Sequence, residues 1–370
     1  MSDSHFNPTT GYGYGDKGRE TLDLIYARVF GAQSALVRLN FVNGTHAITT
    51  ALFGVLRPGE VLLSATGAPY DTILDSISAK TGGSLQEFGV GYKQIDLTAD
   101  GGFDYPAIGA AISLPNVKMI YVQRSKGYTS RRALNIAQIG DLCEFVHKTR
   151  PDVAVFVDNC YGEFVEKLEP CHVGANLVAG SLIKNPGGGL APTGGYIAGD
   201  DNLVQLAANR LTSVGIGGEC GSTLGHNREL YQGLFMAPHT VLQAIKTALF
   251  CAKTMELLGF ETAPRHDEIR YDIIQAINFG DEELVKAFCR GIQAGAAVDS
   301  YVTPEAWAMP GYDCPVIMAA GTFISGASIE LSADAPIRPP YTVYMQGGLT
   351  YESGKFGIMT AIDKMLEIGK

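Results

Sequence analysis

Short apolar runs alternate with longer amphipathic stretches over the first half of the chain. The clearest run is V-A-V-F-V at 153–157, which is rich in β-branched residues and typical of a buried strand. Similar runs predict strands at 36–41, 61–64, 117–123, 177–181 and 196–198. Helical spacing of apolar residues predicts helices over 20–30, 45–55, 71–81 and 136–150. Strands that alternate with helices in this way predict the parallel sheet of an α/β domain.

The pattern becomes more mixed after about residue 235. It predicts a helix over 236–258, a strand at 273–277, a helix over 282–294 and short strands near Val316, Ile329 and Val343. A length of 370 residues suits two domains. We therefore expect an N-terminal arm over 1–18, a large α/β domain over 19–234 and a smaller α+β domain over 235–370.

Composition and charge exclude several classes of protein. The chain is 46% hydrophobic and 18% charged, so it has enough apolar surface to fold. Its 45 glycines indicate many tight turns and close backbone approaches. The net charge is −10, and the densest basic spots are Arg131-Arg132 and the pair Arg265 and Arg270, so a nucleic-acid partner is not expected.

The absence of targeting, membrane-spanning and metal-binding motifs predicts where the protein is located and whether it binds a metal. The first ten residues carry no signal-peptide core, and no apolar run approaches the roughly 20 residues of a membrane span, so no membrane partner is expected. Seven widely spaced cysteines without C-x-x-C predict a reduced, cytoplasmic protein. The seven histidines show no H-E-x-x-H spacing, so we expect no metal site.

Gly13-x-Gly15-x-x-Gly18 spells a dinucleotide-binding fingerprint, but the residues before it do not resemble a strand. Because that fingerprint works only between a strand and a helix, we do not expect a dinucleotide site here.

A stronger constellation follows two of the predicted strands. Asp158 ends the apolar run at 153–157, and Ser181 and Lys184 lie at and just past the end of the run at 177–181, before a Gly-rich loop. Ligands of open α/β sheets bind at the carboxyl ends of strands. A desolvated lysine suits imine formation, a carboxylate keeps a pyridinium nitrogen protonated, and a serine suits a phosphate oxygen. Pyridoxal phosphate (PLP) requires these three roles, although each residue alone could be a cap or a solvated loop residue.

These residues also carry a family resemblance. V-D-N-x-Y at 157–161 and S-x-x-K at 181–184 resemble the Cys/Met-metabolism branch of fold-type-I PLP enzymes, which includes methionine γ-lyase and cystathionine β-lyase. Longer strings across nearly the whole chain are similar to the aluminium resistance, or methionine-γ-lyase-like, family: G-Y-G-Y-G-D-x-G-R-x-T-L, N-G-T-H-A-I, V-D-N-C-Y-G-E-F-V-E, S-L-I-K-N-P-G-G-G, I-R-P-P-Y and Q-G-G-L-T-Y-E. The resemblance implies a fold-type-I transferase fold with a mainly parallel seven-stranded sheet. Because family members usually have a further N-terminal segment, this chain is expected to begin partway along.

The resemblance implies cofactor roles at matching positions. Lys184 would hold PLP and shuttle protons, Asp158 would pair with the ring nitrogen, and Ser181 would bind the phosphate. Gly44 and Thr45 match the start of a helix whose N–H groups hold the phosphate, which suits a helix N-terminus.

Further matches concern the ring, the substrate and a partner subunit. Tyr70 would stack on the cofactor ring, although it could be an ordinary half-buried loop aromatic. Arg338 would bind the substrate carboxylate through its planar fork. Tyr12 and Tyr14 match an arm that reaches a neighbouring subunit's site, so a homodimer or homotetramer is expected; a flexible tail is the alternative.

Some positions stay open at this point. His46, Arg124 and Arg210 lie near proposed site segments without an assigned role, and Cys160 is interpreted as core. Tyr70 is followed by Asp71 and Thr72, whereas better-characterised methionine γ-lyases carry a cysteine soon after this tyrosine. This departure does not favour methionine as the substrate.

The predicted activity is carbon–sulfur bond cleavage. We expect β- or γ-elimination on a sulfur-containing amino acid of the methionine or cystathionine class, giving a 2-oxo acid, ammonia and a thiol. Two alternatives remain: another PLP reaction on the same fold, such as transamination or aldolase-type cleavage, or a catalytically weak PLP-fold protein linked to metal tolerance.

Overall fold

The structure, a computed structural model, describes residues 1–309 and 312–368 and divides into two compact units. Unit 1 contains Met1–Ser125, Leu134–Leu182 and Ala191–Tyr231. Unit 2 contains Gln232–Lys370 together with two short segments from the first half of the chain, Lys126–Ala133 and Ile183–Leu190. The segment that carries Lys184 therefore packs with the C-terminal part of the chain.

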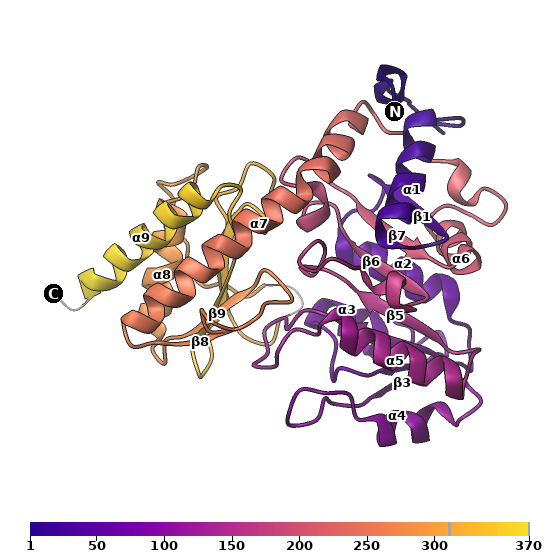
Figure 1. Cartoon of the computed structure of the whole chain (residues 1–370), viewed down its shortest axis with the longest axis horizontal. Coiled ribbons are helices and arrows are strands. Elements are labelled where there is room, and N and C mark those ends of the chain that lie inside the picture. Colours follow the sequence, from indigo (N-terminus) through magenta and orange to yellow (C-terminus); the bar gives the residue numbers. More distant parts are fainter. Residues whose placement is uncertain (310–311, 369–370) are drawn as a thin grey trace. The chain divides into compact units, whose positions relative to one another are not determined.

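Unit 1 contains a seven-stranded sheet with the order β1-β7-β6-β5-β4-β2-β3 (Figure 1). Its strands are β1 (Ser34–Arg38), β2 (Val61–Ser64), β3 (Gly91–Gln94), β4 (Val117–Gln123), β5 (Ala154–Asp158), β6 (Leu177–Ser181) and β7 (Gly195–Gly199). The pairings from β3 through β6 are parallel, and β7 runs antiparallel to both β6 and β1. This confirms the expected mainly parallel sheet.

Helices cover both faces of this sheet. They are α1 (Lys17–Phe30), α2 (Gly44–Val55), α3 (Asp71–Ser78), α4 (Tyr105–Ile112), α5 (Ile136–Thr149) and α6 (Asp201–Leu211). Successive residues of a strand point to opposite faces. On β7, Ile197 packs in the cluster formed with α2 and α6, whereas Tyr196 contacts Tyr26 and Phe30 of α1. The sheet is therefore buried on both sides, which explains its continuous apolar runs.

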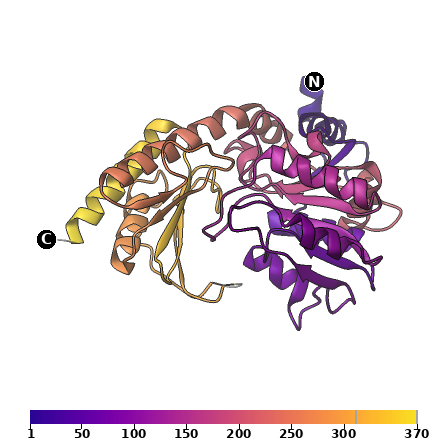
Figure 2. The same ribbon diagram turned by 60° about the horizontal axis from the view of Figure 1, so that its bottom comes forward.

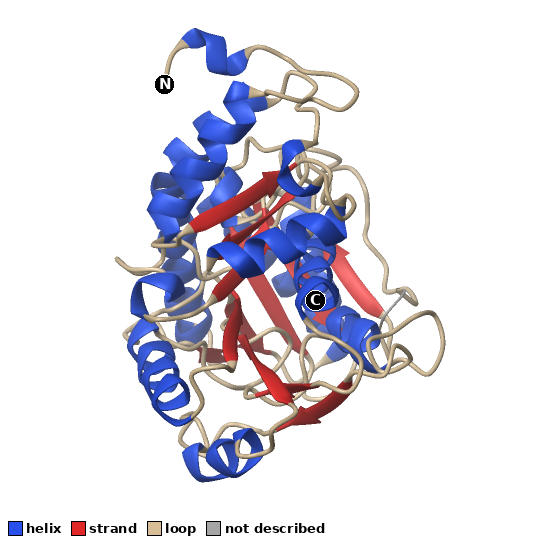
Figure 3. Ribbon diagram, turned by 90° about the vertical axis from the view of Figure 1, so that its right-hand side faces the viewer, coloured by secondary structure: helices blue, strands red, loops and turns tan. Residues whose placement is uncertain are grey.

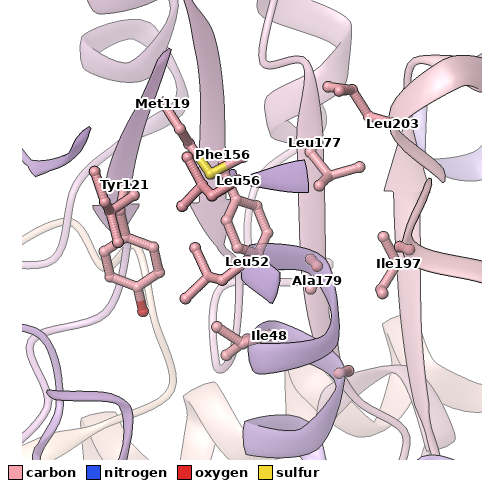
Figure 4. Close-up of a cluster of buried hydrophobic side chains, with 14 of the residues drawn as sticks. Ile48, Leu52, Leu56, Met119, Tyr121, Phe156, Leu177, Ala179, Ile197 and Leu203 are labelled. Atoms are coloured by element: carbon pink, nitrogen blue, oxygen red, sulfur yellow. The ribbon is translucent and has the colours of Figure 1, made fainter. Parts of the chain in front are cut away.

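The core of unit 1 lies between α2 and the central strands (Figure 4). Leu52 of α2 is fully buried, and Met119, Phe156 and Leu177 of β4, β5 and β6 belong to the same cluster. The apolar side of α2 packs in this cluster, and this packing fixes the position of the helix against the sheet. The cluster therefore helps to position the start of α2.

Unit 2 contains a five-stranded antiparallel sheet with the order β10-β11-β12-β9-β8. Its strands, red in Figure 3, are β8 (Glu261–Ala263), β9 (Gln275–Asn278), β10 (Val316–Ala319), β11 (Leu331–Pro336) and β12 (Thr342–Gly347). The helices of this unit are α7 (Asn227–Leu257), α8 (Glu282–Ala294) and α9 (Tyr351–Ile368), drawn in orange to yellow in Figure 2. Residues of all three share one buried cluster with this sheet. Close helix packing depends on Gly291 of α8, where an added Cβ would overlap the Ala361 Cα of α9.

Helix α7 is 31 residues long and, by length and composition, could cross a membrane. The sequence did not indicate this helix as a possible membrane span, because its apolar residues do not form one unbroken run. The core helix of a globular protein meets the same criteria, and 44% of the most apolar window of α7 is buried against other parts of the protein.

Several predicted elements are confirmed, and others were missed. The runs at 61–64, 117–123 and 177–181 coincide with β2, β4 and β6. The strand expected at 36–41 lies at Ser34–Arg38, and the helix expected over 20–30 begins at Lys17, where Asp16 accepts a hydrogen bond from the Arg19 N–H. The missed elements are β3, β8, α4, α6 and α9.

Truncation of the unit 1 core should cost measurable stability. Leu52→Ala removes a fully buried side chain between α2 and the sheet, so we expect the free energy of unfolding to fall by about 3 kcal/mol. Urea denaturation followed by circular dichroism measures this. The same change at the exposed Leu24 of α1 should cost far less, and equal losses in the two variants would contradict the assignment of the core.

Candidate active site

Three neighbouring parallel strands end at one edge of the unit 1 sheet. In their register, Asp158 of β5 lies opposite Gln123 of β4 on one side and Ala179 of β6 on the other. Ser181 is the last residue of β6. Asp158 and Ser181 are 7% and 1% exposed. The structure therefore brings these two predicted residues to the same carboxyl edge, as the parallel arrangement requires.

The Asp158 carboxylate is held by one donor on each oxygen. The Cys160 backbone N–H donates to Oδ1 at 3.1 Å, and the Tyr121 hydroxyl donates to Oδ2 at 3.1 Å. Two hydrogen bonds from different elements restrict the rotation of the carboxylate. Cys160 contributes its backbone to this arrangement, and its side chain is buried, as the interpretation of Cys160 as core implies.

Arg124, whose role the sequence left open, belongs to a buried polar network beside Asp158. Its guanidinium donates to the Asn159 Oδ1 at 2.8 Å and to Glu166 at 2.9 Å, and its backbone N–H donates to the Asp158 carbonyl at 3.1 Å. Asn159 in turn donates to Glu169 at 2.8 Å. Burial raises the pKa of Glu169, and the nearby Arg124 charge opposes that rise. Arg124 thus contacts the backbone of Asp158 and the side chain of Asn159, which follows it.

The N-terminus of α2 approaches the end of β6 at a glycine. Asn43 caps the helix by accepting a hydrogen bond from the His46 N–H at 2.8 Å. A Cβ on Gly44 would lie 3.0 Å from the Ser181 Cβ, so this close approach depends on glycine. The N–H groups in the first turn of a helix have no partner within the helix and attract anions. Gly44, Thr45 and the Ser181 hydroxyl therefore fit a phosphate group.

Tyr70 is positioned by the end of β4. It is half-buried and precedes α3, and its backbone N–H donates to the Gln123 Oε1 at 2.7 Å. Thr45 Oγ1 lies 3.3 Å from Thr72 Oγ1, which links the first turns of α2 and α3. No role for Gln123 was predicted from the sequence, where it only lies near the site segments. Its hydrogen bond with Tyr70 links β4 to that residue and forms only in the tertiary structure.

The arm that carries Tyr12 and Tyr14 is held against unit 1 by its backbone. Arg19 donates to the Gly13 carbonyl at 2.6 Å, and the Gly221 N–H donates to the Tyr12 carbonyl at 2.9 Å. The two tyrosine rings stack on each other with centroids 5.3 Å apart, and both are more than half exposed. The arm is therefore anchored by its backbone while its aromatic rings remain accessible.

Two further predicted residues belong to unit 2. Lys184 precedes the short 3-10 helix Asn185–Gly187, and its carbonyl accepts a hydrogen bond from the Gly187 N–H at 3.3 Å. Arg338 follows β11 and donates to both carboxylate oxygens of Asp313, at 2.9 and 3.1 Å. A substrate carboxylate at Arg338 would therefore have to replace an exposed aspartate.

Asp334 of β11 is a buried carboxylate that was missed from the sequence. Gln346 of β12 donates to its Oδ2 at 2.8 Å. Burial raises the pKa of Asp334 to about 6, while hydrogen bonds from Gln346 and Tyr128 and the charge of Lys184 act in the opposite direction. Asp334 is thus close enough to Lys184 to interact with its charge. The signal in the sequence was an aspartate between alanines in L-S-A-D-A-P.

His46 and Arg210 line a separate cavity of about 650 Å³ in unit 1. The His46 Nδ1 accepts a hydrogen bond from the Val42 N–H at 3.1 Å, and burial lowers the pKa of His46. The Arg210 guanidinium lies over the Phe53 ring at 5.4 Å. The His46 contact therefore belongs to the start of α2, and the Arg210 contact joins α6 to α2.

Comparison with known proteins shows the family of this chain. The sequence profile of the methionine gamma-lyase family matches residues 1–366. This chain belongs to that family. Its relatives include the uncharacterised protein YnbB of Bacillus subtilis, 54% identical over 99% of this chain and 88% of that protein.

Solved structures include close neighbours. One is a carbon–sulfur lyase involved in aluminium resistance from Clostridium novyi, with a TM-score of 0.94 and 52% identity over 99% of this chain and 86% of that one. Another, from Listeria monocytogenes, is provisionally described as a cystathionine beta-lyase involved in aluminium resistance. Its TM-score is 0.96, with 51% identity over 99% of this chain and 90% of that one.

More distant matches agree on the fold. The PLP-dependent protein YhfS of Escherichia coli has a TM-score of 0.61 at 16% identity, over 95% of this chain and 86% of that one, which shows a shared fold. L-methionine gamma-lyase of Pseudomonas putida is 28% identical over 53% of this chain and 44% of that protein. Membership of the methionine gamma-lyase family supports a carbon–sulfur lyase as the enzyme class and implies PLP as the cofactor.

An added methyl group at Gly44 should weaken phosphate binding in this methionine gamma-lyase family member. In Gly44→Ala the new Cβ lies 3.0 Å from Ser181, so we expect the PLP dissociation constant of the apoprotein to rise about tenfold, a loss of about 1.4 kcal/mol, with little change in melting temperature. Gly109→Ala in α4 is the control, because its Cβ would lie 3.3 Å from Phe145. Absorbance titration measures binding, and equal affinities in both variants would contradict the proposed phosphate site.

Asp334 should make stability depend on pH. Its folded pKa of about 6 lies above the unfolded value of about 3.9, so the folded chain holds this proton more tightly and stability is lost as pH rises through that window. Asp334→Asn removes the effect, so its unfolding free energy relative to wild type should rise by about 2 kcal/mol between pH 4 and pH 7. Chemical denaturation across this range measures the difference, and a difference that does not change with pH would refute the assignment.

Proposed function

We propose that this chain is a PLP-dependent carbon–sulfur lyase that performs β- or γ-elimination on a sulfur-containing amino acid, giving a 2-oxo acid, ammonia and a thiol. The observation that carries the proposal is the shared edge of β5 and β6, where an oriented, buried carboxylate and a serine beside a helix N-terminus lie together. These residues match the two ends of the cofactor, a pyridine nitrogen and a phosphate.

When bound, the cofactor supplies an electron sink for negative charge that develops at the substrate Cα. The Asp158 carboxylate would accept a hydrogen bond from the ring nitrogen and keep it protonated. Ser181 Oγ and the N–H groups of Gly44 and Thr45 would bind the phosphate. The Tyr70 ring would lie against the pyridine ring, where the hydrogen bond from its N–H to Gln123 would keep it in place.

The remaining roles concern the substrate and its protons. Lys184 Nζ would anchor the cofactor covalently and, once released, take the Cα proton. Arg338 would exchange Asp313 for the α-carboxylate of the amino acid, because both are carboxylates that accept hydrogen bonds from its guanidinium. Tyr12 and Tyr14 would reach the site of a neighbouring subunit in a cytoplasmic homodimer or homotetramer, where the Tyr14 hydroxyl would assist proton transfer.

Loss of the anchoring lysine should abolish the covalent adduct. We expect wild-type protein reduced with borohydride to carry the cofactor on the peptide that contains Lys184, and Lys184→Ala to lack this modification. Lys246→Ala, a change at an exposed lysine of α7, is the control and should keep the adduct. Mass spectrometry measures both, and an adduct retained in Lys184→Ala would disprove the lysine assignment.

The reaction type is tested by its products. Methionine, cystathionine, cysteine and homocysteine should be assayed at saturating PLP for keto acid and for the released sulfur product, which is a thiol from the first two and hydrogen sulfide from the last two. Release of both products without an added amino acceptor supports elimination. A requirement for an acceptor 2-oxo acid would instead show transamination and overturn the proposed function.

A further inference from the structure

Two basic segments that lie far apart in the sequence line one pocket of unit 2. The pocket has a volume of about 430 Å³ and is formed by residues from 126–133 and 262–272. Its charged lining consists of four basic side chains and two acidic ones: Lys126, Arg131, Arg132 and Arg265, with Glu268 and Asp272. The lining therefore carries two more basic than acidic groups, in a chain whose net charge is −10.

Lys126 forms a buried part of the pocket wall. It is 2% exposed, and its Nζ donates to the neutral carbonyl of Ala263 at 2.6 Å. Burial lowers the pKa of Lys126, the negative charge of Asp272 raises it, the charges of Arg270 and Arg131 lower it, and that of Glu268 raises it. An anion bound in the pocket would add a second favourable charge beside this ammonium group.

Arg270 places another buried positive charge behind the same segment. It is 7% exposed, and one of its nitrogens donates to the Gln275 Oε1 at 2.5 Å. Its Nε and Nη1 have no hydrogen-bond partner among residues 1–309 and 312–368. Asp272, which is 1% exposed, is the buried carboxylate that accompanies these two cations. Buried charge without full compensation is costly, so the local positive excess favours an anionic ligand.

The rim of the pocket is ordered by Glu268. Its Oε1 accepts from the Arg132 Nη2 at 2.5 Å, and its Oε2 accepts from the Arg265 backbone N–H at 2.8 Å. This carboxylate ties the two basic segments together and leaves the Arg265 guanidinium paired more loosely, with Asp267 at 3.5 Å. Guanidinium groups at a rim suit planar or tetrahedral oxyanions, which they can bind with two hydrogen bonds.

We propose that this unit 2 pocket binds a small organic or inorganic oxyanion through a carboxylate or phosphate group. The volume suits a metabolite-sized molecule rather than a polymer. The inference does not depend on the proposed lyase activity, because it concerns binding in unit 2 and its test does not measure turnover.

The test is calorimetric titration of the PLP-loaded protein with inorganic phosphate and, separately, with succinate, in potassium chloride of constant ionic strength. Loading with PLP keeps phosphate out of the cofactor's phosphate site. We expect at least one of the two anions to bind, and the stronger binder identifies the ligand group. Arg131→Ala, which removes a lining cation, should weaken that binding at least tenfold.

Two further variants separate binding from folding. Ser130→Glu adds a negative charge at an exposed lining position without altering the buried wall, and it should also weaken binding at least tenfold. Arg290→Ala in α8 removes an equal charge that pairs with Glu305 outside the pocket, so it should bind the anion as wild type does. Circular dichroism and bound-PLP absorbance verify that each variant is folded.

Two results would overturn the proposal. One is that neither anion produces heat above the potassium chloride baseline. The other is that an anion binds Arg131→Ala and Ser130→Glu as tightly as wild type, which would place it elsewhere, for example at Arg338. An adduct retained in Lys184→Ala would disprove the lysine assignment but leave this inference unaffected, so the two proposals fail independently.

Discussion

The parallel pairing of β4, β5 and β6 is the constraint on which the candidate site depends. A parallel register directs the carboxyl ends of all three strands to one edge, so Gln123, Asp158 and Ser181 meet there although the chain separates them. Their contributions differ, because Gln123 holds the backbone of Tyr70, Asp158 presents a fixed carboxylate, and Ser181 faces the start of α2. The pairing is stabilised by apolar side chains on both faces, which is why the site rests on a rigid base.

Two further features shape this edge of the sheet, the close approach of α2 to Ser181 and the buried network around Arg124. Gly44 lets the helix N-terminus come within contact distance of Ser181, and a larger residue would push the two apart. Buried polar groups beside the site need hydrogen-bond partners to offset the cost of their burial. The Arg124 guanidinium is paired with Glu166 and Asn159, and Asn159 in turn donates to Glu169. The same hydrogen bonds fix the backbone that carries Asp158.

Unit 2 also contains buried charges that are only partly paired. Asp334 has its pKa raised by burial, and Lys126 and Arg270 share one fully buried carboxylate. Groups of this kind are frequent at functional sites, because the cost of burying them is offset by a ligand or a reacting group. The two cases differ in the sign of the buried charge. Asp334 is an acid near the predicted anchoring lysine, whereas the pocket is lined by more basic than acidic side chains.

The sequence alone predicted the type of sheet and the positions of β2, β4 and β6, because buried strands produce continuous apolar runs. Its local motifs also indicated candidate cofactor residues, whose roles stay predictions. It missed β3, whose G-Y-K-Q lacks an apolar run, and α9, whose Gly354 and Gly357 weaken the helical pattern. Those glycines are explained by packing, since a Cβ on Gly357 would lie 2.5 Å from Leu331. Only the tertiary structure decided the contacts of Arg124, the burial of Asp334 and the lining of one pocket by both Arg131 and Arg265, because burial and charge pairing arise between segments that are distant in the chain.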